Sequence, residues 1–98
     1  MTILNEEILF EWDEAKAESN RLKHGIDFND AINVFSDPNA YADEDVRFEY
    51  GETRIKIIGK MDHQLIAAVV YTDRYQKIRI ISARKARKDE KEKYHSQS

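Results

Sequence analysis

Positively charged side chains alternate with isoleucines in two segments of the second half of the chain. Arg54 and Lys56 do so within Thr53–Met61, and Arg79 stands among the isoleucines of the segment that begins at Ile78. Successive side chains of a strand point to opposite faces of the sheet, so Arg54 and Lys56 lie opposite Ile55 and Ile57. Arg79 lies opposite Ile78 and Ile80 in the same way. If the two strands share the sheet, the three cations can gather on one face. Guanidinium groups gathered on an open sheet face suit the phosphates of single-stranded RNA. The alternative is a solvated face with ordinary cross-strand ion pairs.

An aromatic ring and further cations can join this face. Depending on register, Tyr71 or Thr72 lies between Arg54 and Arg79, and a tyrosine ring there suits stacking on a base. Ser82 is a candidate N-cap for a last helix, whose sparse apolar stripe fits a helix at the sheet edge, a partner-binding helix or a simply solvated one. Backbone N–H groups at a helix start favour anions, and the cations expected there are Arg84, Lys85, Arg87 and Lys88.

His24 is the histidine with a chemical interpretation. It is expected at the end of the first helix, where the helix dipole stabilises an imidazolium, and its unperturbed pKa near neutrality suits acid–base catalysis. A C-terminal capping residue is the alternative. The histidines and carboxylates lack metal-site spacing, and the sequence shows no phosphate-loop, nucleophile-elbow or dinucleotide motif. An enzyme with this sequence is therefore expected to work without a metal or cofactor.

The charges divide unevenly along the 98 residues, although the net charge is only −3. Met1–Glu52 holds 4 Lys/Arg against 14 Asp/Glu, and Thr53–Ser98 holds 12 against 5. This predicts a basic working face opposite an acidic one, unless the fold interleaves the two halves. The sequence has no cysteine, no signal-peptide pattern and no apolar run near the roughly 20 residues of a membrane helix, so we expect a cytoplasmic protein.

The elements that must position these side chains follow from periodicity and capping signals. A strand is predicted over Ile8–Trp12, then a helix from the N-cap Asp13 to about His24, ended by Gly25. A second helix is predicted from the N-cap Asp27, with Asp30 as a capping-box partner, to Asp37-Pro38-Asn39. Strands are predicted over Tyr41–Tyr50, Thr53–Met61, Leu65–Thr72 and from Ile78, and a last helix from Ser82 to about Tyr94.

The predicted fold is α+β, in the order β-α-α-β-β-β-β-α. Short turns make the strands an antiparallel meander, with helices on one side and the opposite face at least partly free. The length predicts a single domain over residues 1–98 with flexible ends.

Three stretches together resemble the BrnT toxins of bacterial type II toxin–antitoxin systems. They are "FEWDEAKAESNRLKHGIDFNDAINVFSDP", "RFEYGETR" and "VVYTDRYQKIRIISARKARKDEKEKY", which span about Phe10 to Tyr94. The resemblance implies a RelE-like ribonuclease fold, metal-independent RNA cleavage, and inhibition of translation and growth. It also implies a BrnA-type ribbon-helix-helix antitoxin, with operator DNA bound only through the toxin–antitoxin complex. One departure is Tyr75, where the family often has a glycine.

The resemblance also marks residues in three motifs. Lys23, His24 and Gly25 match the K-H-G motif; Arg47, Tyr50, Gly51, Glu52 and Arg54 match R…Y-G-E-x-R; Arg79, Ser82, Ala83, Arg84 and Ala86 match the closing motif, followed by Glu90 and Tyr94.

The leading hypothesis is a sequence-tolerant endoribonuclease. Arg54, Arg79 and Arg84 would stabilise the phosphorane, Glu52 or His24 would be the base, and Tyr50 or Tyr71 would orient the substrate or donate a proton. The residues expected to bind RNA are Lys23, Arg47, Lys56, Tyr71, Arg74, Lys85, Arg87 and Lys88. The alternative is a non-catalytic protein- or RNA-binding module that acts through the basic sheet face and the last helix. In either case, an acidic antitoxin segment is expected to cover the basic surface.

Overall fold

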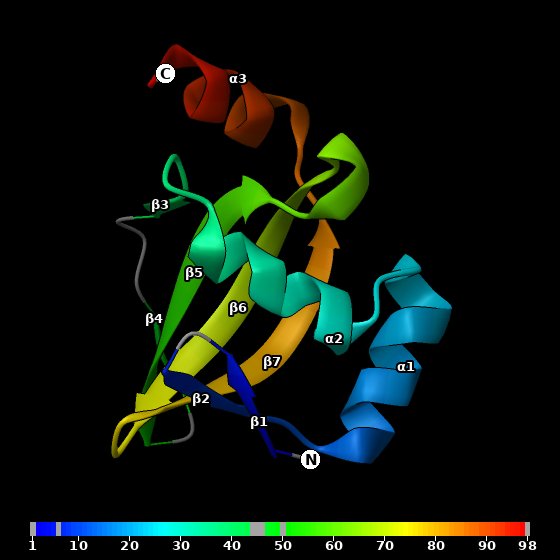
Figure 1. The fold of residues 1–98 in the computed structure, drawn as a ribbon, viewed down its shortest axis with the longest axis vertical. Coiled ribbons are helices and arrows are strands. Elements are labelled where there is room, and N and C mark those ends of the chain that lie inside the picture. The colour runs from blue at the N-terminus through cyan, green and yellow to red at the C-terminus, as the bar shows by residue number, and fades with distance from the viewer. Residues whose placement is uncertain (1, 6, 44–46, 50, 98) are drawn as a thin grey trace.

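The computed structural model describes residues 2–5, 7–43, 47–49 and 51–97. Along the chain its elements are β1 (Thr2–Asn5), β2 (Ile8–Glu11), α1 (Glu14–His24), α2 (Phe28–Ala31), the 3₁₀ helix η1 (Ile32–Ser36), β3 (Tyr41–Ala42), β4 (Arg47–Glu49), β5 (Glu52–Lys60), the 3₁₀ helix η2 (Asp62–Gln64), β6 (Ile66–Arg74), β7 (Lys77–Lys85) and α3 (Lys88–Ser96) (Figure 1). The predicted α+β class is confirmed.

The described strands form one sheet in the order β1-β2-β7-β6-β5-β3, and β4 pairs with β5. The pairs between β5, β6 and β7 are antiparallel, as predicted for a meander. β2 instead pairs with β7 in parallel. β1 was not predicted, and it forms an antiparallel hairpin with β2. The expected strand over Tyr41–Tyr50 is two short strands, with residues 44–46 and 50 outside the described part.

The predicted caps of the first two helices are confirmed. The Asp13 side chain accepts a hydrogen bond from the Lys16 N–H at 3.1 Å, and Gly25 ends α1 with a left-handed φ of 73°. The Asp27 side chain accepts from the Asn29 N–H at 2.8 Å rather than through a box with Asp30. The second helix is α-helical for one turn only and continues as η1.

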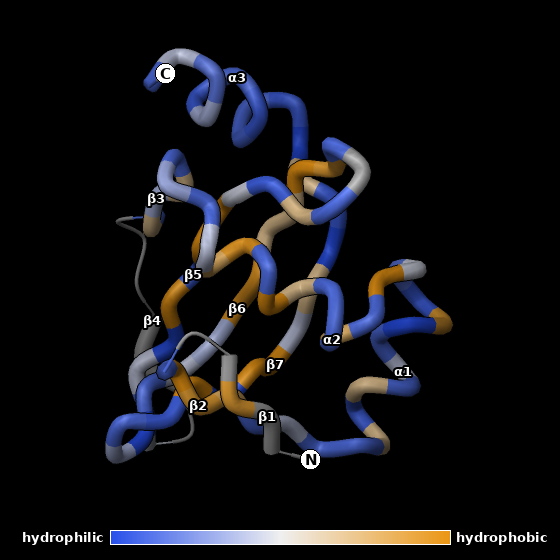
Figure 2. The backbone as a smooth tube through the Cα atoms, in the orientation of Figure 1, coloured by the Kyte–Doolittle hydropathy of each residue, from blue (hydrophilic) through white to orange (hydrophobic). Residues whose placement is uncertain are grey.

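The main core lies between the sheet and α2–η1, which cross one of its faces (Figure 1). Its fully buried side chains include Phe10, Phe28, Val34, Val69 and Ile80. η1 approaches β5 closely at Gly59, where an added Cβ would lie 2.8 Å from Val34 Cγ1 and 2.9 Å from Ala40 Cβ. Figure 2 shows the hydrophobic strand centres behind α2. None of the described helices is long and apolar enough to cross a membrane.

The end of the last strand differs from the prediction. β7 continues to Lys85 because Ala83 and Arg84 pair with Val69 and Ala68 of β6, so Ser82 is a strand residue and not an N-cap. The N-cap of α3 is Arg87. Arg84 and Lys85 therefore lie on the strand, not at a helix N-terminus. A bulge opposite Val70/Tyr71 shifts the alternation of β7 by one residue. Ile80 and Ala83 therefore both face the main core, although they are three positions apart.

α3 covers one end of the sheet face opposite α2. It is hydrophilic along most of its length (Figure 2), and Tyr94 is its buried apolar anchor. Tyr94 packs in a second cluster with Ile58, Ile66, Ala68 and Ala86. The prediction that the helices share one side of the sheet therefore does not hold for α3. The opposite face is partly free, as predicted, and its free part forms the open face described below.

Candidate functional site

The open face is the side of the sheet that carries Arg54, Thr72 and Arg79. Arg79 pairs with Thr72 in register, and Arg54 follows one step beyond the Ile55–Tyr71 pair. Thr72, only 2% exposed, is therefore the residue between the two arginines. Tyr71 points to the other face, where its ring meets the Phe35 ring at 5.0 Å. The expectation that Tyr71 joins the basic face is wrong, because strand alternation sends it into the main core.

A first group of charges on this face, the arginine–glutamate cluster, consists of Glu11, Glu52, Arg54, Arg74 and Arg79. Arg79 Nη1 donates to Glu11 Oε2 at 3.0 Å. Arg74 donates to Glu52 Oε2 from Nε at 3.1 Å and from Nη2 at 2.8 Å. Arg54 Nη2 lies 4.0 Å from Glu52 Oε1. The cluster gathers residues from the four strands β2, β5, β6 and β7.

The electrostatics of this cluster keep Glu52 ionised. The hydrogen bonds from Arg74 lower the pKa of the Glu52 carboxyl, against a smaller effect of burial, and the charges of Arg54 and Arg79 lower it further. Lys77 Nζ also lies 3.8 Å from Glu11 Oε1, so cations outnumber carboxylates among the described side chains that form these contacts. Arg79 and Arg54 are 27% and 19% exposed and so remain accessible in part. The cluster therefore combines a carboxylate of lowered pKa with several positively charged side chains.

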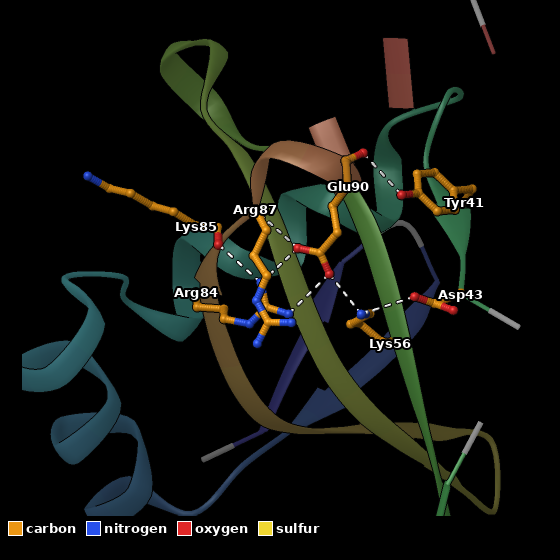
Figure 3. A network of polar contacts seen from close by, with 7 residues as sticks. All are labelled: Tyr41, Asp43, Lys56, Arg84, Lys85, Arg87 and Glu90. Carbon is orange, nitrogen blue, oxygen red and sulfur yellow. Dashed lines mark hydrogen bonds and ion pairs between the residues drawn. The ribbon is translucent and has the colours of Figure 1, made fainter. Parts of the chain in front are cut away.

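A second group, the Glu90 cluster, lies under α3 and consists of Tyr41, Asp43, Lys56, Arg84 and Glu90 (Figure 3). Arg84 grips Glu90 with both terminal nitrogens, at 2.8 and 3.1 Å. Lys56 Nζ lies 2.7 Å from Glu90 Oε2 and 3.0 Å from Asp43 Oδ2. The Tyr41 hydroxyl donates to the Glu90 carbonyl at 3.1 Å.

Glu90 is held as a buried anion, with only 5% of its side chain exposed. Burial raises the pKa of Glu90, but the hydrogen bonds from Arg84, the Arg87 N–H and Lys56 outweigh it and lower the pKa to about 2. Arg84 and Lys56, both predicted to contact RNA, are thus joined to α3 by this carboxylate. The Lys85 side chain extends away from the cluster (Figure 3), and Lys88 is exposed on the first turn of α3.

His24 and Lys23 belong to a third place, the α1–β7 groove. This open cavity of about 220 Å³ lies between α1 and the free edge of β7, and its polar lining includes Lys16, Ser19, Lys23, His24 and Ser82. His24 thus lines a different part of the surface from Glu52, so the two proposed bases do not share one site.

Two predicted residues cannot be placed as side chains. Tyr50 lies outside the described residues, and for Arg47 the description covers the backbone, which pairs with Arg54 in register. Within the described ranges, no group of three or more histidines and carboxylates is arranged to hold a metal ion.

The site residues that were not predicted from the sequence are Glu11, Ser19, Lys16, Asn20, Tyr41, Asp43 and Lys77. Strand alternation did put Glu11 on the face opposite Phe10, but only the parallel pairing of β2 with β7 brings it to Arg79. Asn20 and Lys16 lie on the same side of α1 as Lys23, as their spacing of three and four residues indicates. The sequence alone did not show that this side packs against β7.

Comparisons with known proteins bear on the family and the fold of the chain. Residues 12–90 match the model of a family described as "Ribonuclease toxin, BrnT, of type II toxin-antitoxin system". The 1.1 Å crystal structure of the Brucella abortus ribonuclease toxin BrnT is similar, with 30% sequence identity and a TM-score of 0.62, over 81% of this chain and 96% of that one. No curated protein sequence matches the chain.

Proposed function

Because the chain belongs to the BrnT family of ribonuclease toxins of type II toxin–antitoxin systems, we propose that it is a metal-independent endoribonuclease whose active site is the arginine–glutamate cluster. The observation that supports this most directly is that Arg54 and Arg79 lie on one partly exposed sheet face, beside Glu52 and Glu11 respectively, and that the charges of both arginines lower the pKa of Glu52. Arginine charge at this point supplies the stabilisation that a metal ion supplies in other nucleases.

The proposed reaction is an internal transesterification. The ribose 2′-oxygen attacks the adjacent phosphorus while its proton passes to a carboxylate, either Glu52 or Glu11. Arg79 and Arg54 stabilise the extra negative charge on the phosphorane oxygens. The bond from phosphorus to the 5′-oxygen then breaks, and the leaving oxygen takes a proton, for which Tyr50 is the candidate donor. The products are a 2′,3′-cyclic phosphate and a 5′-hydroxyl.

Arg84 receives a different role in this proposal from the one first expected. Its guanidinium already forms two bonds to Glu90, so we assign it to anchoring α3 rather than to the phosphorane. His24, which lines the α1–β7 groove, is likewise not the base.

The test is cleavage of a mixed-sequence RNA by purified protein in the presence of EDTA. Wild-type protein is expected to cleave, and Arg79→Ala is expected to lose at least about 10²-fold in rate while it keeps its fold. Arg21→Ala is the matched control, because Arg21 also pairs with a glutamate, Glu18, but on the exposed surface of α1. A folded Arg79→Ala protein that cleaves normally would refute the assignment, and loss of cleavage in EDTA would refute metal independence. RNA binding without cleavage would favour the binding-module alternative.

The biological consequence proposed is inhibition of translation and growth, relieved by a BrnA-type ribbon-helix-helix antitoxin. The excess positive charge of the arginine–glutamate cluster supports an acidic antitoxin segment that covers this face and excludes RNA. Raised salt is then expected to weaken the toxin–antitoxin complex. A salt-insensitive complex would indicate an apolar interface elsewhere.

A further inference from the structure

Two lysines of α1 line the groove between this helix and the edge of β7. Lys16 and Lys23 lie about two helical turns apart on the side of the helix that lines this groove, roughly 10 Å along the axis, with Ser19 and Asn20 between them. Asn20 holds this side against the edge, because its amide bonds to both backbone groups of Ala83, at 2.9 and 3.1 Å. The cations above β7 are therefore held at a defined position by a buried anchor.

The α1–β7 groove differs from the other basic places in its charge balance. Arg79, Arg84, Arg74 and Lys56 each lie within 3.0 Å of a glutamate oxygen. The described residues that line the groove include Lys16, Lys23 and His24 but no aspartate or glutamate. The hydroxyls of Ser19 and Ser82 add neutral hydrogen-bond donors. Such a lining suits an anion with several acceptor oxygens.

The start of α1 lies near both the groove and the arginine–glutamate cluster. Asp13, at the start of α1, accepts the Lys16 N–H, and the charges of both Lys16 and Arg79 lower the pKa of its carboxyl. Lys16, which lines the groove, and Arg79, which belongs to the cluster, are therefore both near Asp13. A flexible polyanion on Arg79 can continue over the edge of β7 along α1.

We propose that the α1–β7 groove is a phosphodiester subsite, which binds the backbone of the RNA strand one or more nucleotides away from the scissile bond. Lys16 and Lys23 contact phosphates, and Ser19, Ser82 and His24 donate hydrogen bonds to their oxygens. The inference rests on the proposed ribonuclease function, whose reacting phosphate lies at Arg79 and Arg54. It makes His24 a ligand of the RNA backbone rather than a general base.

The test measures binding separately from cleavage. The probe is a fluorescent 2′-O-methyl RNA of about 12 nucleotides, which lacks the attacking hydroxyl and stays intact. Its affinity is measured between about 50 and 200 mM salt for wild type, for Lys16→Gln/Lys23→Gln and for Lys60→Gln/Lys91→Gln. The last variant removes the same charge from two exposed lysines outside the groove. Each phosphate contact on a single strand contributes about 0.7 to the slope of log affinity against log salt.

The groove variant is expected to lower this slope by about 1.4 and to weaken binding, while the control variant keeps the wild-type slope. Equal slopes for the two double variants would overturn the subsite. Cleavage of ordinary RNA by wild type, assayed in parallel, separates this result from the proposed function. If wild type cleaves RNA but the two double variants have equal slopes, the subsite alone is refuted. If the groove variant loses slope but wild type does not cleave, phosphate binding in the groove is supported and the ribonuclease assignment is refuted. No binding and no cleavage refutes both.

Discussion

The side chain of Asn20 pairs with the backbone of Ala83 as a neighbouring strand would. Its Nδ2 donates to the Ala83 carbonyl at 2.9 Å, and its Oδ1 accepts from the Ala83 N–H at 3.1 Å. The same amide donates to the Ile26 carbonyl at 3.2 Å, so it also joins the loop after α1. Beyond Arg79, β7 has no strand partner on this side among the described residues. Asn20 therefore supplies the hydrogen bonds that the buried N–H and carbonyl groups of Ala83 would otherwise lack.

The first prediction concerns this amide. Asn20→Ala removes the hydrogen bonds and leaves both Ala83 backbone groups without their partner, so the free energy of unfolding is expected to fall by about 2–4 kcal/mol. Urea denaturation measures the change. Ser19→Ala, on the neighbouring exposed position, is expected to change it by less than about 0.5 kcal/mol. Similar values for the two variants would contradict the anchoring role.

The second prediction concerns the attachment of α3. Glu90→Gln leaves Arg84 and Lys56 close together without their shared carboxylate, which is expected to cost about 3–5 kcal/mol. Glu92→Gln, on the exposed side of the same helix, serves as the control. In the Glu90→Gln background, Arg84→Gln is expected to cost much less than in wild type, because its partner is already absent. Additive costs in this double-mutant cycle would show that the two residues act independently.

The third prediction follows from the pKa of Glu90, which the fold lowers from 4.5 to about 2. Because the folded protein favours the ionised form, this stabilisation is complete above pH 4.5 and is lost as the pH falls toward 2. Its full size is about 3 kcal/mol. The stability difference between wild type and Glu90→Gln should therefore shrink steadily over this interval. A difference that stays constant from pH 5 to pH 3 would exclude Glu90 as the titrating group.

The fourth prediction identifies the base. If Glu52 accepts the 2′-OH proton, Glu52→Gln is expected to lower kcat by about 10²–10⁴-fold, and Glu11→Gln by much less. The pKa of Glu52 is lowered, mainly by Arg74. The acidic limb of kcat/KM should consequently lie below pH 4.5 in wild type and move to higher pH in Arg74→Gln. The opposite ranking of the two glutamate variants would assign the base to Glu11.

The ends of the first two helices could be predicted from local signals in the sequence. The caps at Asp13 and Asp27 and the left-handed Gly25 were predictable because each depends on a few neighbouring residues. The turn after β6 is an exception, since Tyr75 and Gln76 both adopt positive φ, at 46° and 70°, without a glycine. There, the pairing of β6 with β7 imposes the hairpin geometry on residues that do not favour it.

Tertiary pairing decided the ends of elements and the membership of the site. Ser82 had the chemistry of an N-cap, but the bonds of β6 to Ala83 and Arg84 extended the strand past it. The parallel pairing of β2 with β7 brought Glu11 to Arg79, a contact between residues 68 positions apart. No local pattern encodes such a contact, because it depends on which strands become neighbours.

By itself, the sequence determined that Arg54 and Lys56 share one face of their strand and that Arg79 lies opposite Ile78 and Ile80 on its own strand, because alternation along a strand is a property of the backbone alone. Only the tertiary structure decided what each of these cations does. Lys56 contacts the buried carboxylate of Glu90 under α3, whereas Arg54 lies beside Glu52 and Arg79 beside Glu11, both partly exposed. The reason is physical: a side chain's direction is set by its own strand, but its partner is set by the packing of elements that are distant in sequence.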